Sequence, residues 1–223
     1  MSAGDLVNRA VDKSNKHDYQ GAIQDLTQAI RLQPNFEIAY NNRGNARFNL
    51  GDYRGAIADY DRAIQLQPDY GVPYNGRGNA RRKLGDSQAA LRDYNRAIQL
   101  TPNDPFPYNG RGNVHLDLGD YQAALRDYSR SIRLQPKYAH PYNGRGLVQA
   151  KLGNSKAALR DYSQAIQLKP DYADAYLNRG RLHSELGNRQ SAIADLQKAA
   201  NLYQKQGDRE NYQAAIAQLE KLR

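Results

Sequence analysis

The sequence contains no cysteine and no tryptophan, and only three phenylalanines. Without cysteine, the chain has no disulfide bond, no thiolate nucleophile and no thiolate metal ligand. The residues that follow Met1 contain no apolar run of the kind found in a signal peptide. No window approaches the roughly 18 apolar residues that a membrane-spanning helix needs. We therefore expect a soluble, cytoplasmic protein with no membrane partner.

Charge and tyrosine are what the sequence has in abundance. Its 223 residues include 32 lysines and arginines against 23 acidic residues, which gives a net charge of +9. This excess permits nucleic-acid or acidic partners but does not require them. The aromatic content is carried almost entirely by 17 tyrosines.

A period of 34 residues organises nearly the whole chain. Counted from residue 37, the sequence divides without insertions into six units and a tail at 207–223. The units are 3–36, 37–70, 71–104, 105–138, 139–172 and 173–206. Residues are compared below by their unit position, counted from the first residue of each unit. Because the units stay in phase, each is expected to be one copy of the same supersecondary structure.

Small and large residues alternate at fixed unit positions. Position 8 is always glycine or alanine, position 20 is always alanine, and tyrosine recurs at positions 4 and 24. Small residues allow two helices to approach closely, and rings fill the space between them. The pattern therefore predicts an array of packed helices in which every unit repeats the same contacts.

Turn residues divide each unit into two helices. A mid-unit glycine suits the left-handed residue after a helix, and the Asp or Asn that follows it is a preferred helix N-cap. These glycines are Gly51, Gly85, Gly119, Gly153 and Gly187. Proline then stops the second helix in five units, at Pro34, Pro68, Pro102, Pro136 and Pro170. Each unit is thus predicted to be a helix, a tight turn and a second helix.

The repeated unit resembles the tetratricopeptide repeat. In the second unit, the residues that carry the resemblance are Tyr40, Gly44, Leu50, Gly51, Tyr53, Ala56, Tyr60, Ala63 and Pro68. The resemblance implies an all-α, right-handed superhelical solenoid over residues 1–206, whose first helices line a concave groove. The tail at 207–223 has a helical pattern and is expected to be a capping helix.

The segment PYNGRG occurs three times and invites comparison with a phosphate-binding loop. Such a loop follows a strand, whereas each of these copies follows a helix-stopping proline and a turn, so we assign it to the repeat architecture. Its second glycine fills position 8. Packing is not expected to require its first glycine, at position 6, because Asn42 and Asn178 occupy that position elsewhere. That glycine is either inherited by duplication or hollows the groove floor.

Arginine and aspartate recur together in all six units. Position 7 is always Arg and position 23 is always Asp, 16 residues apart on the two predicted helices. Arginine and a carboxylate form a geometrically specific pair that is often bidentate. We expect a repeated ion pair, which closes either within one unit or onto the next.

Asparagine forms two rows on the first helices, at unit positions 5 and 9. The residues are Asn41, Asn45, Asn75, Asn79, Asn109, Asn113 and Asn143. A carboxamide offers both a donor and an acceptor and can pair with a peptide's N–H and C=O groups. We expect these rows to hold an extended peptide in the groove, with Ile38, Val72 and Phe106 as an apolar rim. The alternative is that the asparagines bond one another or water and repeat through duplication.

Other functions are less well supported by the residues. The clamp with which some tetratricopeptide repeats hold acidic chaperone tails is not matched, because position 2 has no Lys and position 6 has no Arg. The four histidines show no metal-ligand spacing, so we expect neither an enzyme nor a cofactor. An exposed arginine stripe (Arg92, Arg126, Arg160) leaves RNA binding as an alternative. The near-identity of the central units leaves self-assembly through the solenoid ends as another.

Overall fold

The computed structural model describes residues 1–222, which contain thirteen α-helices and no strand. The first helices of the six units are α1 (Ala3–Asn15), α3 (Glu37–Asn49), α5 (Gly71–Lys83), α7 (Pro105–Asp117), α9 (Ala139–Lys151) and α11 (Ala173–Glu185). The second helices are α2 (Tyr19–Leu32), α4 (Tyr53–Leu66), α6 (Ser87–Leu100), α8 (Tyr121–Leu134), α10 (Ser155–Leu168) and α12 (Arg189–Gln206). The last helix is α13 (Arg209–Glu220). The predicted all-α solenoid of helix pairs is confirmed.

The turns inside the helix pairs follow the predicted chemistry. From the second pair onward, the glycine after the first helix is left-handed, with φ between 75° and 82°. His17 takes the same conformation in the first pair, with φ of 62°. The carboxylates of Asp18, Asp52, Asp86 and Asp120 accept the N-cap hydrogen bond of the second helix. Asn154 and Asn188 also occupy the N-cap position, as predicted, although their side chains make no such bond.

The last helix pair ends differently from the others. The second helices of the earlier pairs end two residues before their prolines, whereas the sixth unit has no proline there. Helix α12 consequently runs on to Gln206, and Gly207 ends it with a φ of 73°. Helix α13 packs on α12 and contributes buried Ala215 and Leu219 to a cluster with Leu202 and Tyr203. Its role as a cap is consistent with this packing and stays a prediction.

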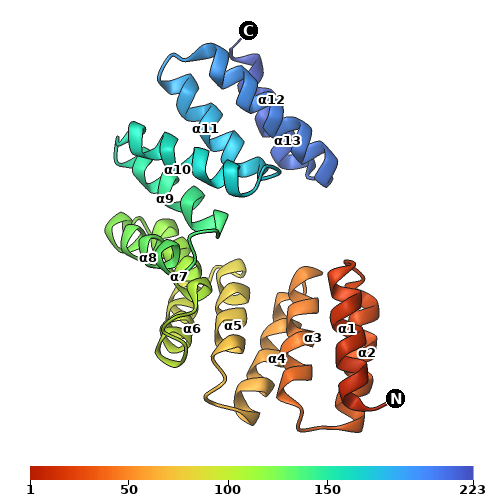
Figure 1. The fold of residues 1–223 in the computed structure, drawn as a ribbon. Helices are drawn as coiled ribbons and strands as arrows, with labels where there is room; N and C mark the ends of the chain where they lie inside the picture. The colour runs from red at the N-terminus through yellow and green to blue at the C-terminus, as the bar shows by residue number, and fades with distance from the viewer. Residues whose placement is uncertain (223) are drawn as a thin grey trace. The chain divides into compact units, whose positions relative to one another are not determined.

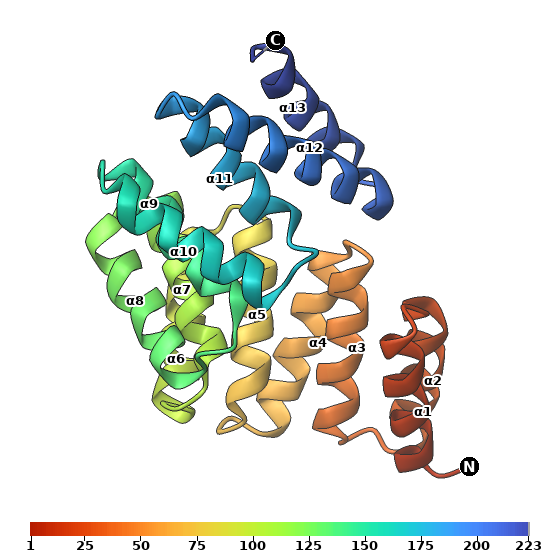
Figure 2. The same cartoon turned by 45° about the horizontal axis from the view of Figure 1, so that its top comes forward.

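The helices group into two compact units, of which the first is Met1–Val114 and the second starts at His115. In the first, α1 to α6 pack in sequence order, each helix contacting the next, and α1, α3 and α5 also contact in succession (Figures 1 and 2). In the second, α8 to α13 pack in the same way, and α9 contacts α11. Each unit is therefore a stack of neighbours, as expected when one repeat buries its apolar face on the next.

The repeated Arg–Asp pair closes within one helix pair and also reaches the preceding pair. Arg77 donates Nε–H and Nη2–H to the two carboxylate oxygens of Asp93, at 3.0 and 2.6 Å. Its Nη1 donates at 2.6 Å to Asp61 on the second helix of the preceding pair. Of the two alternatives left open by the sequence, the Arg–Asp pair therefore closes within one unit, and the contact with the preceding pair is an additional one. We call this arrangement the arginine fork.

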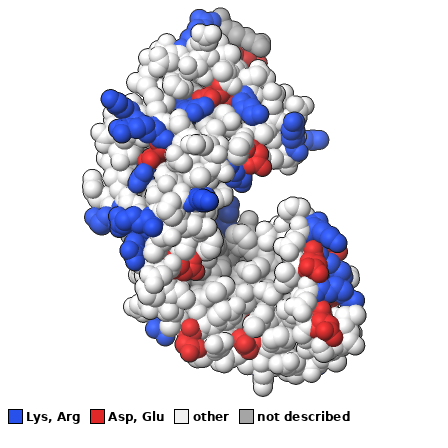
Figure 3. Space-filling model, viewed as in Figure 1, with Lys and Arg blue, Asp and Glu red and all other residues white. Residues whose placement is uncertain are grey.

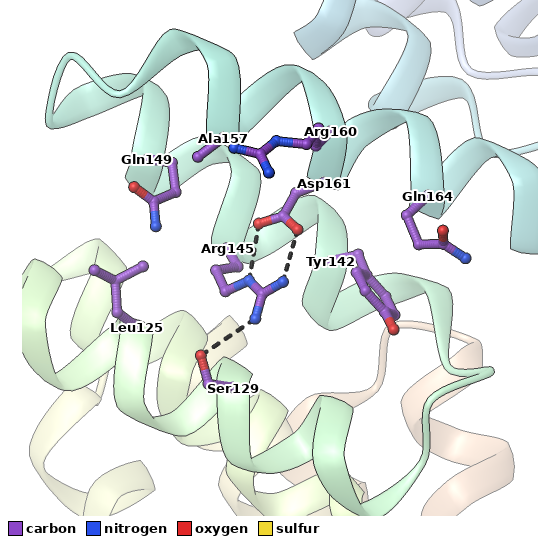
Figure 4. Close-up of a pocket in the computed structure, with 9 residues that line it drawn as sticks. All are labelled: Leu125, Ser129, Tyr142, Arg145, Gln149, Ala157, Arg160, Asp161 and Gln164. Atoms are coloured by element: carbon purple, nitrogen blue, oxygen red, sulfur yellow. Dashed lines mark hydrogen bonds and ion pairs between the residues drawn. The ribbon is translucent and has the colours of Figure 1, made fainter.

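The same fork recurs where the structure describes it, with a different polar acceptor on the preceding pair. Arg145 donates to both oxygens of Asp161 and, at 3.4 Å, to the Ser129 hydroxyl (Figure 4). The acceptors at unit position 25 of the preceding pair are Thr27, Asp61, Asn95, Ser129 and Ser163. The Asp is buried in each case. The fork therefore satisfies a buried carboxylate and fixes the register between consecutive pairs.

Replacing Arg77 with Met tests how much one arginine fork contributes to the free energy of unfolding. Asp93, whose side chain is only 3 % exposed, would keep Arg81 as its single cationic partner, and Asp61 would lose its own. Because an incompletely compensated buried carboxylate is costly, we expect a loss of about 2–4 kcal/mol in the free energy of unfolding. Urea denaturation followed by circular dichroism measures it. The exposed Arg54→Met variant is the control, and an equal effect in both variants would contradict the assignment.

Candidate functional site

The asparagines at unit position 9 accept hydrogen bonds from buried tyrosines. The Tyr60 hydroxyl donates to Asn45 Oδ1 at 2.7 Å, and the Tyr94 hydroxyl donates to Asn79 Oδ1 at the same distance. Both rings are at most 1 % exposed. Burial raises the pKa of Tyr60, so its hydroxyl stays protonated and remains a donor. The two carbonyl oxygens are thus held inward, and each Nδ2 amide group is left to face away from the ring.

Glycines on both sides make room for these rings. A Cβ on Gly44, in the same helix pair, would lie 2.7 Å from the Tyr60 ring, and one on Gly76, in the next pair, would lie 2.6 Å from it. Gly144 stands in the same relation to Tyr128, at 2.5 Å. The expectation that packing does not require the first glycine of GRG is therefore wrong for these copies. At both positions, the absence of a side chain leaves the space that a tyrosine ring occupies.

In the second helix pair, Asn41 at unit position 5 lies deeper than Asn45 at position 9. Asn41 is only 3 % exposed, although the sequence pattern places it on an exposed helix face. Its Nδ2 donates to Asn42 Oδ1 at 3.3 Å. The Oδ1 atoms of Asn41 and Asn75 are buried and accept no hydrogen bond from the described residues. A buried acceptor of this kind favours a donor from water or from a ligand.

The remaining predicted residues lie on several helices. Asn109 and Asn113 are half-buried on α7. Asn143 on α9 is half-buried and donates to the Tyr172 hydroxyl at 3.3 Å, while its Oδ1 accepts from Asn178 at 3.1 Å. The three apolar rim residues are exposed by 40–47 %: Ile38, Val72 and Phe106.

One hollow in the first compact unit brings four of the predicted residues together. It has a volume of about 340 Å³ and is bordered by helices α3, α4 and α5. Its predicted members are Asn45, Val72, Asn75 and Asn79, and its further lining is Phe48, Asn49, Tyr60 and Gly76. None of these eight side chains is charged. Asn41, Asn109, Asn113, Asn143, Ile38 and Phe106 lie outside this hollow.

The sequence reasoning missed the role of tyrosine in this site. It placed the tyrosines in the packing and the asparagines in the groove, and it did not connect them. A signal was available, because unit positions 24 and 9 hold Tyr with Asn in three units. In the first unit the same positions hold Leu26 and Val11, neither of which makes a hydrogen bond through its side chain. An aromatic hydroxyl and its acceptor thus occur together in these three units, and both are absent from the first.

The arginines of the predicted stripe do not line this hollow. Arg92, Arg126 and Arg160 are exposed on the second helices, as predicted, whereas Arg81 is bound to Asp93 at 2.7 Å. In the view of Figure 3, lysine and arginine side chains gather over α8 and over the α9–α10 hairpin. The hollow described above is lined by neutral residues and does not include this surface.

Family models match the chain along most of its length. Models described as tetratricopeptide repeat match residues 38–70, 112–177 and 173–206, and one described as TPR repeat matches 16–51 and 78–119. The chain belongs to the tetratricopeptide repeat family. Proteins with these repeats bind other proteins or peptides and are typically scaffolds without catalytic activity. The tetratricopeptide repeat fold of this chain supports a role as a protein-interaction scaffold in general.

Solved structures show the same fold. The chain of the APC/C hetero-tetramer Cut9-Hcn1 structure matches with a TM-score of 0.91 at 19 % identity, over 99 % of this chain and 43 % of that one. MamA matches with a TM-score of 0.60 at 25 % identity, over 74 % of this chain and 96 % of that one. YrrB, described as a TPR protein with an unusual peptide-binding site, matches with a TM-score of 0.57 at 24 % identity. That match covers 86 % of this chain and 97 % of YrrB.

A comparison with curated proteins finds no match to this tetratricopeptide repeat protein. Within residues 1–222, the structure contains no helix with the length and apolar character required to cross a membrane.

Gly76→Ala tests whether the packing of the Tyr60 ring requires glycine at this position. Alanine is the better helix former by about 1 kcal/mol, but its Cβ overlaps the ring, and overpacking costs about 1–3 kcal/mol. We expect a net loss of stability in the wild-type background and a gain in a Tyr60→Leu background, because the first unit likewise has Leu26 in place of the tyrosine and the second unit has Asn42 in place of the glycine. Midpoints of chemical denaturation for the four proteins measure the coupling. The same change in midpoint in both backgrounds would show that the ring does not require glycine.

Proposed function

We propose that the hollow between α3, α4 and α5 binds an extended peptide segment of a partner protein. The observation that carries the proposal is the hydrogen bond from each buried tyrosine to an asparagine carbonyl. Because Tyr60 and Tyr94 occupy the Oδ1 atoms, Asn45 and Asn79 offer N–H donors, which suit the main-chain carbonyls of a peptide.

The remaining lining of the hollow suits a peptide that is bound mainly through its main chain, with little selection for its sequence. Asn75 brings a buried Oδ1 without a donor, which suits a main-chain N–H group. Gly76 carries no side chain, so a peptide backbone can come close to the helix there. Val72 and Phe48 offer apolar contacts to peptide side chains, and the lining contains no charge to select for one. YrrB, which has a similar fold, is described as having a peptide-binding site.

Selection from a display library of random twelve-residue peptides tests this function. The affinity of an enriched peptide is measured by fluorescence anisotropy. We expect Asn45→Ala combined with Asn79→Ala to weaken binding at least tenfold, which is about 1.4 kcal/mol. Asn103→Ala changes an exposed asparagine in a loop and is the matched control. Failure to enrich any peptide, or equal affinity for both variants, would reject the hollow as a peptide site.

Tyr60→Phe separates the orienting role of the hydroxyl from the presence of the asparagine. The phenyl ring keeps the packing, but Asn45 loses the donor that holds its carbonyl inward. We expect peptide affinity to fall about three- to tenfold with the helix content unchanged, because the amide group is then free to turn. Circular dichroism provides the check on folding. Unchanged affinity would mean that Asn45 does not bind through a fixed amide orientation.

A further inference from the structure

The bond between tyrosine and asparagine is missing where α9, α10 and α11 meet in the second compact unit. Tyr162 occupies the unit position of Tyr60 and is 1 % exposed. The position-9 residue of its helix pair is Leu147, which has no acceptor, and position 6 of the next pair is Asn178 rather than glycine. Over residues 1–222, the Tyr162 hydroxyl has no hydrogen-bond partner. A buried hydroxyl is thus left available as a donor.

Two cations border the same place. Tyr162 lines a hollow of about 290 Å³, together with Leu147, Lys151, Asn178, Arg181 and Glu185. Neither Lys151 nor Arg181 forms a hydrogen bond or an ion pair with any described residue. The Nε of Arg181 is buried without an acceptor. Most arginines at unit position 7, by contrast, are fully engaged with aspartate.

Among the side chains that line this hollow, the polar groups without a hydrogen-bond partner are donors, apart from one carboxylate. Tyr162 supplies an O–H, Arg181 a guanidinium and Lys151 an ammonium group, while the Asn178 amide is already bound to Asn143. Lys151 and Arg181 bring two positive charges and Glu185 one negative charge, which leaves a net charge of +1. A ligand with one negative charge neutralises these three side chains. A dianion would face Glu185 with an excess of negative charge.

We propose that the hollow bordered by Tyr162, Lys151 and Arg181 binds the carboxylate of an acidic side chain in a partner peptide. The proposal rests on the proposed function in taking a peptide as the ligand. It concerns other residues, in the other compact unit, so the two sites can fail separately. Tyr162 and Arg181 donate to the carboxylate oxygens, and Lys151, which is exposed, adds its charge from solvent.

Capped pentapeptides of alanine with a central Asp, Asn or phosphoserine are the probes. The full-length protein is labelled with ¹⁵N, and the Arg181 Nε–H resonance is followed during titration. We expect the Asp peptide to shift this resonance with a Kd at least tenfold lower than that of the Asn peptide. Equal Kd values would overturn the proposal. Binding of the phosphoserine peptide more than tenfold tighter than the Asp peptide would overturn the assignment of a carboxylate.

Leu147→Asn is the most informative variant, because it recreates the position-9 asparagine of Asn45 and Asn79. Its Oδ1 gives Tyr162 an internal acceptor, so we expect Asp-peptide affinity to fall three- to tenfold without loss of helix. Arg181→Gln is expected to lower it at least tenfold, with Nε–H signals of other arginines and the Lys151 amide as reporters. Arg160→Gln, exposed on α10, is the control. Unchanged affinity in Leu147→Asn and Arg181→Gln would refute the site.

The peptide site of the first compact unit provides the separating control. Asn45→Ala combined with Asn79→Ala is expected to leave the Asp-peptide titration unchanged. Loss of display-selected binding together with an intact Asp-peptide response would confirm both sites as distinct. If a display-selected peptide depends on Asn45 and Asn79 but the Asp peptide gives no response, only the carboxylate site is rejected.

Discussion

The arginine fork is the interaction on which the rest of the array depends. A guanidinium has donors on two edges, so Arg77 can satisfy a buried carboxylate in its own helix pair and still bind the preceding pair. A lysine in its place would offer a single charged centre and would not define the angle between these two partners. The fork also places its arginine over a tyrosine ring at unit position 4, 5.3 Å away in the case of Arg77 and Tyr74. That tyrosine hydroxyl donates to the carbonyl of Pro68 at the preceding turn, so one residue aligns three segments.

Fixed register is what allows the groove to have a defined chemistry. Tyr60 reaches Asn45 in its own pair and lies against Gly76 of the next pair, and this three-part contact requires the pairs to stack at a constant offset. The mid-helix glycines cost about 1 kcal/mol each in helix propensity. Burial of a tyrosine ring contributes more than this amount. The same contact that joins two pairs therefore also sets which end of the asparagine amide faces the groove.

Much of this structure follows from the sequence, and the reasons for the remainder are specific. The 34-residue phase, the left-handed glycines and the Asp N-caps depend on local chemistry, which a single unit displays. From the second pair onward, the third donor of the arginine goes to a residue 16 positions earlier, and the aspartate of the same arginine lies 16 positions later, as in Arg43. Spacing alone could not decide between them, because both are used. Asn41 was expected on an exposed face, yet it is only 3 % exposed, and the pattern of a single unit does not reveal this burial.

Duplication multiplies residues whether or not each copy has a use, so a repeated residue is weak evidence of a ligand. Tyrosine, asparagine and glycine at the Tyr60 contact come from three helices and depend on one another, which explains their repetition by packing. At Tyr162 two of the three have changed: Leu147 removes the hydrogen-bond acceptor, and Asn178 replaces the glycine beside the ring. In the following pair, Arg181 occupies unit position 9, which Asn45 and Asn79 occupy in their own pairs. The tyrosine that would bond this position is replaced there by Leu196. The loss of these contacts leaves polar groups such as the Arg181 Nε–H without an internal partner, in addition to the Nδ2 groups of Asn45 and Asn79, whose packing role uses only their Oδ1 atoms.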